Sequence, residues 1–146
     1  MVGALSTGRV CIAQSAVDGC KVGLVVAARY ASDRPQFGDR KIASYLTHQR
    51  RLAPAVAQTY ALHLMMSVLK EMLGNRADPK KVHLLSSGLK AAATWTRVEI
   101  LQNCRECCGG MGFLSDNMIP GLITDMNVDV TFEGDNTVLM QQVVKA

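Results

Sequence analysis

The sequence of 146 residues lacks most of the features that mark a specialised chain. It has seven aromatic residues, only four Pro, no low-complexity stretch and a net charge of just +4. With 49% hydrophobic residues, this composition excludes a disordered or collagen-like chain. The length suits one domain with a hydrophobic core, so we expect residues 1–146 to form a single domain.

The sequence also lacks a concentrated charge and a long apolar run. Its basic pairs are dispersed (40–41, 50–51 and 80–81), which predicts a solvated surface and no nucleic-acid partner. The longest apolar run, 22–28, is far shorter than the roughly 18 residues that a membrane span requires, so we expect no span. Residues 1–20 do not combine a basic start with a long apolar core, so no export signal is expected.

Five cysteines are present, three of them in the cluster Cys104, Cys107 and Cys108. An odd number without signs of a secreted context predicts reduced thiols. The Cys-x-x-Cys spacing could form half of a zinc site, but no second pair has a matching spacing. We therefore expect these cysteines to pack as small apolar side chains and expect no metal site.

Apolar residues recur at helical spacing in several stretches. The spacing predicts a first helix over residues 10–31, with small residues that permit close contacts between helices. A second helix should end near Gly74-Asn75, and Pro54 should either open it or kink it. Two adjacent rows in this helix make an apolar face wide enough for a bundle interior: Val56/Tyr60/Leu64/Val68/Met72 and Ala57/Ala61/Met65/Leu69/Leu73.

The third helix has the clearest start, because Asp78 is a good cap and Pro79 suits the first helical position. It should stop at Gly109-Gly110. We expect a short helix near 122–127, an extended segment at 128–132 and a last helix beginning around Asp135-Asn136. The fold class is therefore predicted to be all-α, an up-and-down four-helix bundle.

One carboxylate, Glu133, lies between the apolar segment 128–132 and the predicted last helix. Two interpretations remain open from the residues alone. A constrained turn could aim a partly desolvated carboxylate into the bundle, where it would suit proton abstraction. Alternatively, Glu133 is an acid at a helix start, favoured by the helix dipole, and such structural acids are common.

Four separated blocks change that balance: Arg29 to Gly38 (RYASDRPQFG), Thr47 to Leu52 (THQRRL), Arg105 to Phe113 (RECCGGMGF) and Thr131 to Leu139 (TFEGDNTVL). In order and spacing they resemble the C-terminal helical part of acyl-CoA oxidases, flavoenzymes related to the acyl-CoA dehydrogenases. The Glu-Gly-Asp-Asn run at 133–136 is similar to the oxidase form, whereas Glu-Gly-Thr would be expected in a dehydrogenase.

The resemblance implies a concrete reaction. Glu133 would be the catalytic base that removes the α-proton of a fatty acyl-CoA, while the β-hydrogen leaves as hydride to FAD. The product would be a trans-2-enoyl-CoA, and O2 would be reduced to H2O2, in the first step of fatty acid β-oxidation. The resemblance further implies a homodimer and a peroxisomal location, although the chain ends in no peroxisomal tripeptide.

The resemblance also assigns contacts residue by residue. Arg9 matches an arginine near the acyl-CoA substrate. Several positions match contacts to FAD, some of them across the dimer: Arg34, Phe37, Gln49, Glu106, Gly110, Asp135, Asn136 and Thr137. Arginine suits the pyrophosphate because its planar fork of donors matches phosphate oxygens.

Some positions depart from the family pattern. Met111 and Phe113 stand where oxidases often have His and Tyr, Glu106 replaces a glutamine, and Thr124 replaces an arginine. The N-terminal helical domain and the middle β-domain of the family have no counterpart here, so we expect a fragment with little or no activity by itself. Two alternatives stay open: a noncatalytic helical assembly module, and an acyl-CoA dehydrogenase that uses another electron acceptor.

Overall fold

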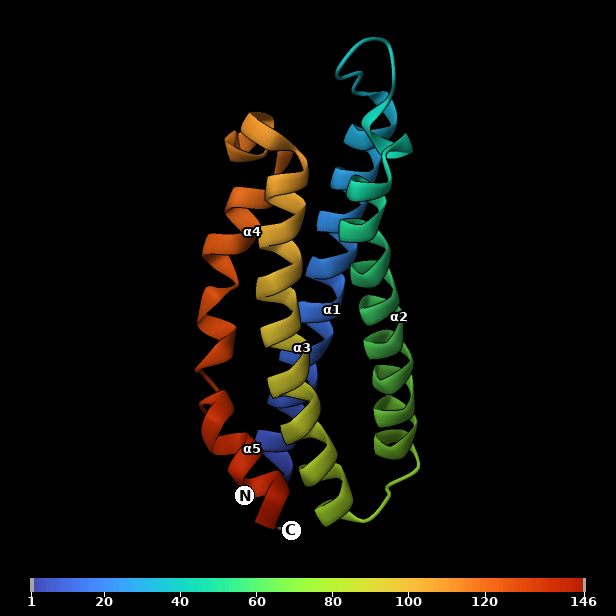
Figure 1. The fold of residues 1–146 in the computed structure, drawn as a ribbon. Helices are drawn as coiled ribbons and strands as arrows, with labels where there is room; N and C mark the ends of the chain where they lie inside the picture. Colours follow the sequence, from blue (N-terminus) through green and yellow to red (C-terminus); the bar gives the residue numbers. More distant parts are fainter. Residues whose placement is uncertain (1, 146) are drawn as a thin grey trace.

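The computed structural model describes residues 2–145, with side chains from residue 6 onward. Three long helices run side by side: α1 (Val2–Asp33), α2 (Leu46–Gly74) and α3 (Pro79–Cys107). The shorter helices α4 (Ile119–Asp125) and α5 (Asn136–Lys145) follow each other in a fourth column beside α3 (Figure 1). Short 3-10 turns complete the described chain: η1 (Ile42–Ser44), η2 (Gly109–Phe113), η3 (Ser115–Asn117) and η4 (Asn127–Val130).

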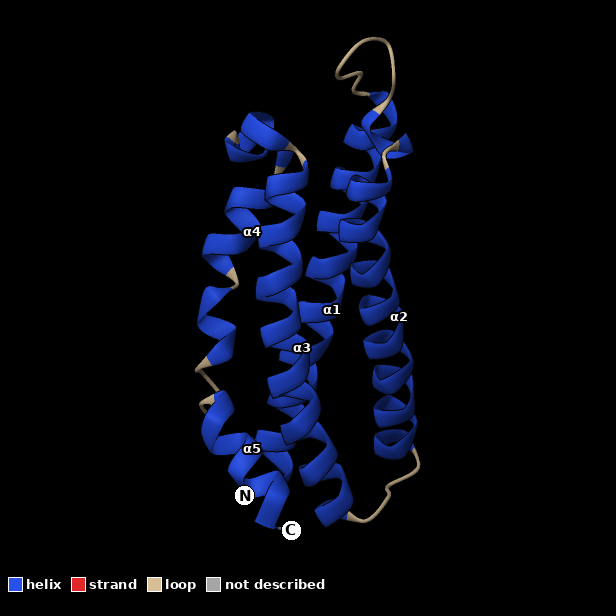
Figure 2. Ribbon diagram, viewed as in Figure 1, coloured by secondary structure: helices blue, strands red, loops and turns tan. Residues whose placement is uncertain are grey.

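Among residues 2–145, β structure is limited to one isolated bridge between Pro35 and Lys41, and Figure 2 shows helices joined by loops. The predicted all-α four-helix bundle is confirmed. The start of α1 and the end of α5 lie at the same pole of the bundle (Figure 1).

Helices α1 and α3 form the centre of the bundle. The inward stripe of α1 is made of small side chains that are fully buried: Ala13, Ala16, Val17, Cys20 and Ala27. Such side chains let two helices approach closely. An added Cβ on Gly23, for example, would lie only 2.6 Å from Leu101 Cδ2 of α3. The stripe predicted for residues 10–31 therefore forms the core, although α1 is longer than predicted at both ends.

Helix α2 lies at the edge of the bundle, where it contacts α1 and α3 along one side (Figure 1). It begins at Leu46, so Pro54 lies inside the helix and does not open it. Both rows predicted to face the interior are largely exposed. In the first, Val56 is 54%, Tyr60 64%, Leu64 51% and Val68 47% exposed. In the second, Ala57, Ala61 and Met65 are exposed, and only Leu69 is fully buried. The predicted interior face is therefore wrong for most of its residues, because α1 and α3 pack against the other side of α2.

The predicted boundaries of α3 agree with the structure. Asp78 caps the helix by accepting a 2.9 Å hydrogen bond from the Lys80 backbone N–H, and Pro79 is the first helical residue. The helix ends at Cys107, and Gly109 has the positive φ of +59° expected of a residue beyond a helix end.

The segment between α4 and α5 corrects the prediction of extended structure at 128–132. It forms η4 and a turn instead. The cause is the buried guanidinium of Arg97 on α3, which pairs with Asp129 and donates to the Met126 carbonyl. These tertiary bonds fold the segment back onto α3, which the local preference of apolar residues for strands does not anticipate.

Two helical segments, Ser6–Asp33 and Leu46–Gly74, are long and apolar enough to cross a membrane by length and composition. The length of the longest uninterrupted apolar run, residues 22–28, did not predict these two segments. In the apolar 18-residue window of the first segment 56% is buried inside the bundle, as expected of a core helix, and in that of the second only 22% is buried. Core helices of water-soluble proteins meet the same criterion, so these segments carry no membrane assignment.

Candidate functional site

The Glu133 turn, residues 131–135, joins η4 to α5 in an unusual backbone conformation. Glu133 has a φ of +58° and Gly134 a φ of +116°. A positive φ is uncommon for a residue with a side chain and carries a conformational cost of order 1–3 kcal/mol. Because the surrounding structure must sustain that cost, residues that bind the turn are of particular interest.

The Glu133 side chain lies against α1 at Gly8. A Cβ added to Gly8 would lie 2.6 Å from Glu133 Oε1 and 2.8 Å from its carboxyl carbon. Only a glycine therefore lets the carboxylate come this close to α1. The second oxygen, Oε2, is buried and has no hydrogen-bond partner among the described residues. Glu133 thus points inward, as its interpretation as a reacting carboxylate requires.

Arg9, the next residue on α1, holds the backbone of the same turn. Its Nε donates to the Glu133 carbonyl at 3.0 Å. Its Nη1 donates to Ser87 Oγ at 3.0 Å and lies 3.3 Å from His83 Nδ1. The side chain is only 6% exposed. The structure therefore places Arg9 beside Glu133, while its contact with a substrate stays a prediction.

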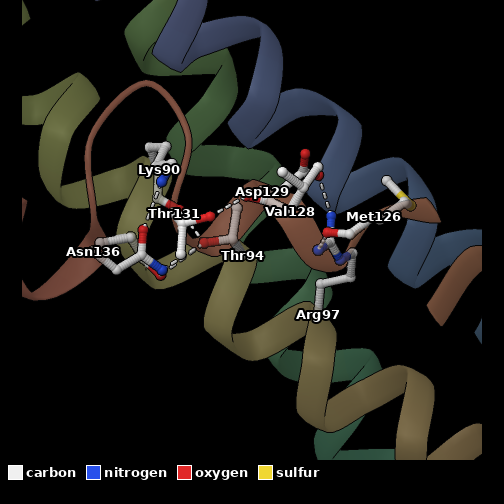
Figure 3. Close-up of polar contacts among 9 residues, drawn as sticks. Lys90, Thr94, Arg97, Met126, Val128, Asp129, Thr131 and Asn136 are labelled. Carbon is white, nitrogen blue, oxygen red and sulfur yellow. Dashed lines mark hydrogen bonds and ion pairs between the residues drawn. The ribbon is translucent and has the colours of Figure 1, made fainter. Parts of the chain in front are cut away.

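Lys90 of α3 also binds the turn, and no sequence pattern singled it out (Figure 3). Its Nζ donates to the Gly134 carbonyl and to Asn136 Oδ1, both at 2.8 Å. Asn136 Nδ2 in turn donates to Thr94 Oγ1 at 2.8 Å. Lys90 and Thr94 are fully buried and Asn136 is 1% exposed. A signal was present in the sequence, because Lys90 lies three residues before Ala93, which is buried on the same side of α3.

Residues 135–137, at the end of the turn and the start of α5, either cap the helix or point into the bundle. Asp135 Oδ1 accepts from the backbone N–H of Thr137 at 2.9 Å and of Val138 at 3.2 Å, so it caps α5 as predicted. The Asn136 side chain is committed to Lys90 and Thr94. Asp135 and Thr137 are exposed next to Glu133. Their contacts with a cofactor stay predictions.

A second group of predicted residues lies at the other end of α1. Arg34 is exposed and makes no ion pair within residues 2–145; its Nε donates to Gln36 Oε1 at 3.4 Å. Phe37 is 87% exposed, has a φ of +55° and packs edge-on against Tyr45. An exposed ring on a strained backbone is typical of a binding loop.

A shallow pocket of about 350 Å³ opens beside this loop. Its lining comes from the loop and from the start of α2: Phe37, Ile42, Tyr45, Thr47, His48 and Arg51. The His48 Nε2 atom is buried and has no partner among the described residues. Burial, with the nearby Arg51, lowers the pKa of His48, so its imidazole is neutral at pH 7 and above. The family resemblance assigned Gln49 to the site but did not assign His48.

Gln49 and Glu106 are held by neighbouring groups. Gln49 Nε2 donates to the Ala43 carbonyl at 2.9 Å. Glu106 accepts from Gln102 at 2.8 Å and from Arg51 at 2.7 Å. These hydrogen bonds lower the pKa of Glu106, which is therefore an ionised carboxylate at neutral pH.

Gly110 lies in η2, beyond the end of α3, where an added Cβ would meet nothing within 4 Å. The surface there is open, so a ligand could approach the backbone closely.

The two groups of predicted residues are far apart within one chain. Gly8, which touches Glu133, and Asp33, which precedes Arg34, are separated by 25 residues of α1. At 1.5 Å per residue this corresponds to about 37 Å. The structure therefore places most predicted residues in two separate sites, the Glu133 turn and the 34–49 loop end, with Glu106 joined to the second through Arg51 and Gly110 apart in η2.

The clustered cysteines lie in the bundle core. Burial raises the pKa of Cys104 to about 12, with a smaller contribution from the neighbouring thiols, and raises the pKa of Cys20 to about 11. These thiols are protonated and apolar at neutral pH. No group of three potential metal ligands occurs within the described part of the chain.

Comparison with known proteins gives the same family over nearly the whole chain. The family model described as "Acyl-CoA oxidase, C-alpha1 domain" matches residues 2–146. The peroxisomal acyl-coenzyme A oxidase 3 of Arabidopsis thaliana is 43% identical over 150 residues, which cover 97% of this chain and 22% of that protein. The chain thus spans about a fifth to a quarter of the length of the curated relatives it matches.

Solved structures of acyl-CoA oxidases share the fold of this chain. Arabidopsis thaliana acyl-CoA oxidase 1 superposes with a TM-score of 0.87 at 30% identity, covering 94% of this chain and 23% of that one. Acyl-CoA oxidase-1 of Caenorhabditis elegans, solved in complex with FAD and ATP, has a TM-score of 0.90 at 24% identity. That match covers 97% of this chain and 23% of the other, and it shows a shared fold. By the family model and the identity over its length, the chain belongs to the acyl-CoA oxidase family, in the C-alpha1 domain.

Proposed function

We propose that this chain is the base-bearing domain of an FAD-dependent acyl-CoA oxidase, which converts a fatty acyl-CoA to a trans-2-enoyl-CoA and passes electrons to O2, with Glu133 as the base. The observation that carries the proposal is the geometry of Glu133. Its carboxylate lies against Gly8, and Oε2 is buried without a partner. A carboxylate oxygen with no donor among the described residues is free to take a proton from a substrate.

The chain's own residues account for the proton transfer. The α-proton of a thioester is weakly acidic, so the accepting oxygen must be held close to the carbon that bears it. The strained turn fixes the position of Glu133, and Arg9 holds its carbonyl. Glu133 Oε2 would receive the α-proton, while FAD, when bound, supplies the acceptor for the β-hydrogen.

The residues at the loop end fit a flavin dinucleotide. The exposed guanidinium of Arg34 is paired with no carboxylate among residues 2–145, so it is available to phosphate oxygens. The exposed ring of Phe37 and the unpartnered His48 Nε2 could pack against and donate to the rest of the ligand. Arg34, Phe37, His48 and Gln49 would hold FAD there.

The distance between the two sites supports a homodimer. The Glu133 turn and the 34–49 loop end of one chain are about 37 Å apart along α1. If both contact a flavin, they contact different flavins, or a second copy of the chain completes each site. The exposed apolar row of α2 offers a surface for such a partner. We propose that two copies of the full protein associate so that the loop end of one completes the Glu133 site of the other.

The assembly can be tested with Leu64→Glu in the full-length protein. A charge in the apolar row should weaken association at least tenfold, because a buried carboxylate without a partner is costly. Sedimentation over a concentration series measures this, with Lys80→Glu on the exposed start of α3 as the control. Association unchanged in the Leu64→Glu protein would remove this row from the interface.

We further propose a peroxisomal location, because the name of the Arabidopsis thaliana oxidase 3 places that relative there. Production of H2O2 from O2 in the full-length protein separates an oxidase from a dehydrogenase. Electron transfer only to another flavoprotein would contradict the oxidase assignment.

The decisive experiment for the base is Glu133→Gln in the full-length flavoprotein. The variant should retain bound flavin, yet acyl-CoA should bleach that flavin several powers of ten more slowly, because an amide cannot accept the proton. Glu99→Gln, an exposed carboxylate on α3, is the matched control and should bleach at the parent rate. Undiminished bleaching in Glu133→Gln would exclude Glu133 as the base.

A further inference from the structure

Two buried cations on different helices hold consecutive carbonyl groups of the Glu133 turn. Arg9 of α1 binds the Glu133 carbonyl at 3.0 Å, and Lys90 of α3 binds the Gly134 carbonyl at 2.8 Å. The two residues whose carbonyl groups are held, Glu133 and Gly134, both have positive φ. Hydrogen bonds from a charged donor are stronger than those from a neutral one, so they suit a backbone that must be kept in a rare conformation.

Lys90 is unusual because both of its contacts are neutral oxygens. They are the Gly134 carbonyl and Asn136 Oδ1, and Lys90 makes no ion pair within residues 2–145. Burying an ammonium group is costly unless acceptors compensate it. Leu or Met at this core position would avoid that cost. The contacts that Lys90 makes with the turn therefore explain why a lysine is buried here.

The charges around Lys90 belong largely to the segment that carries the turn. Burial lowers the pKa of Lys90, and the carboxylates of Asp129, Asp135 and Glu133 oppose that shift, while Arg9 adds to it. The field of the ammonium therefore acts on the Glu133 segment from within the bundle. Together with the two hydrogen bonds from Lys90, it holds the turn from α3, while Arg9 holds it from α1.

We propose that Lys90 is a positioning residue for the Glu133 carboxylate. By binding Gly134 and Asn136 at once, its ammonium group locks the residues after Glu133 and thereby keeps the carboxylate against Gly8. Asn136 passes this restraint to Thr94 through its own 2.8 Å hydrogen bond. The inference rests on the proposed function of Glu133 as the base, since a displacement of about 1 Å at a reacting group can reduce a rate a hundredfold.

The test is Lys90→Met in the full-length flavoprotein, because Met keeps the apolar stem and removes the charge and the donors. We expect kcat per bound flavin to fall tenfold to a hundredfold, with KM for straight-chain acyl-CoA thioesters within twofold of the parent. Lys81→Met, an exposed lysine on the same helix, is the control and should change neither constant.

A purely structural role gives a different result. It would lower the fraction of folded protein in a denaturation curve, but would leave kcat per bound flavin at the parent value. That outcome overturns the inference. A tenfold or greater rise in KM with an unchanged kcat overturns it as well.

Glu133→Gln, measured in parallel, separates this inference from the function on which it rests. If Glu133→Gln abolishes flavin bleaching while Lys90→Met behaves like Lys81→Met, the base assignment stands and the role of Lys90 is refuted. If Glu133→Gln bleaches at the parent rate, the proposed function itself fails.

Should Lys90→Met yield no folded flavoprotein, Thr94→Val tests the same network. It removes the hydroxyl that orients the Asn136 amide while the ammonium group remains. A threefold or greater loss of kcat with unchanged KM supports the inference, and an unchanged kcat overturns it.

Discussion

Helices α2 and α3 have the same length, 29 residues, but opposite surroundings. Helix α3 buries thirteen residues, Lys90 and Arg97 among them, whereas α2 buries four. The difference follows from position: α3 contacts α1, α2 and the α4–α5 column, whereas the long helices that α2 contacts are α1 and α3. Polar groups are therefore concentrated where the structure can satisfy them, and apolar side chains remain on the surface where a partner could cover them.

The contrast between the buried helix α3 and the exposed helix α2 predicts the largest loss of stability at Arg97, the other buried cation of α3. In Arg97→Met, Asp129 would be left as a buried carboxylate without its partner, and the Met126 carbonyl would lose its donor. We expect the free energy of unfolding to fall by about 3–5 kcal/mol, as measured by urea denaturation. Arg105→Met, a partly exposed arginine on the same helix, should cost less than about 1 kcal/mol. A similar loss in both variants would show that burial does not distinguish them.

The two sides of α2 should differ in the same way. Met66 is 1% exposed and Leu64 is 51% exposed. We expect Met66→Ala to lower the free energy of unfolding by about 2–5 kcal/mol, because it leaves a cavity in the core. Leu64→Ala should change it by less than about 0.5 kcal/mol when measured at concentrations where the protein is monomeric. Equal losses would mean that the outer row of α2 is packed within the monomer.

The core between α1 and α3 should also protect its thiols. The pKa of Cys20, raised from 9.0 to about 11, leaves a thiolate fraction about a hundredfold below that of an ordinary thiol at neutral pH. Iodoacetamide labelling with mass spectrometry should modify the exposed Cys11 long before Cys20 or Cys104. Rapid labelling of Cys20 in folded protein would show that this interface opens.

These thiols also predict a loss of stability in alkali. Their folded pKa values lie above the value of 9.0 for an ordinary thiol, so the unfolded state releases its protons first. Their contribution is complete below about pH 9 and is lost as the pH rises toward 11–12. Denaturation curves across this range, compared with those of Cys20→Ala, measure the effect.

Local signals in the sequence predicted the ends of helices well. Asp78 and Asp135 cap α3 and α5 as expected, because a cap depends on residues only two or three positions away. The extended segment at 128–132 was predicted wrongly, since Arg97 lies 32 residues from Asp129 along the chain and periodicity does not report such pairs. The outer row of α2 was misplaced because an apolar row has the same pattern whether its partner is in the same chain or another.

The candidate site was predictable only in part. The resemblance directed attention to Glu133, and the structure places its carboxylate in the bundle. No short-range pattern could show that Gly8 makes room for it or that Arg9 and Lys90 hold successive carbonyls of its turn. These residues are separated from their partners in the turn by 44 to 125 positions in the sequence and meet only after the helices have packed.

The common pole of α1 and α5 has a consequence for how the domain connects to other polypeptide. Gly8 is six residues from the first residue of α1, or about 9 Å along the helix, and Glu133 precedes α5 by three residues. Any polypeptide joined at Val2 therefore begins within two helical turns of the carboxylate. A neighbouring domain attached there would lie close to the Glu133 turn after a very short tether.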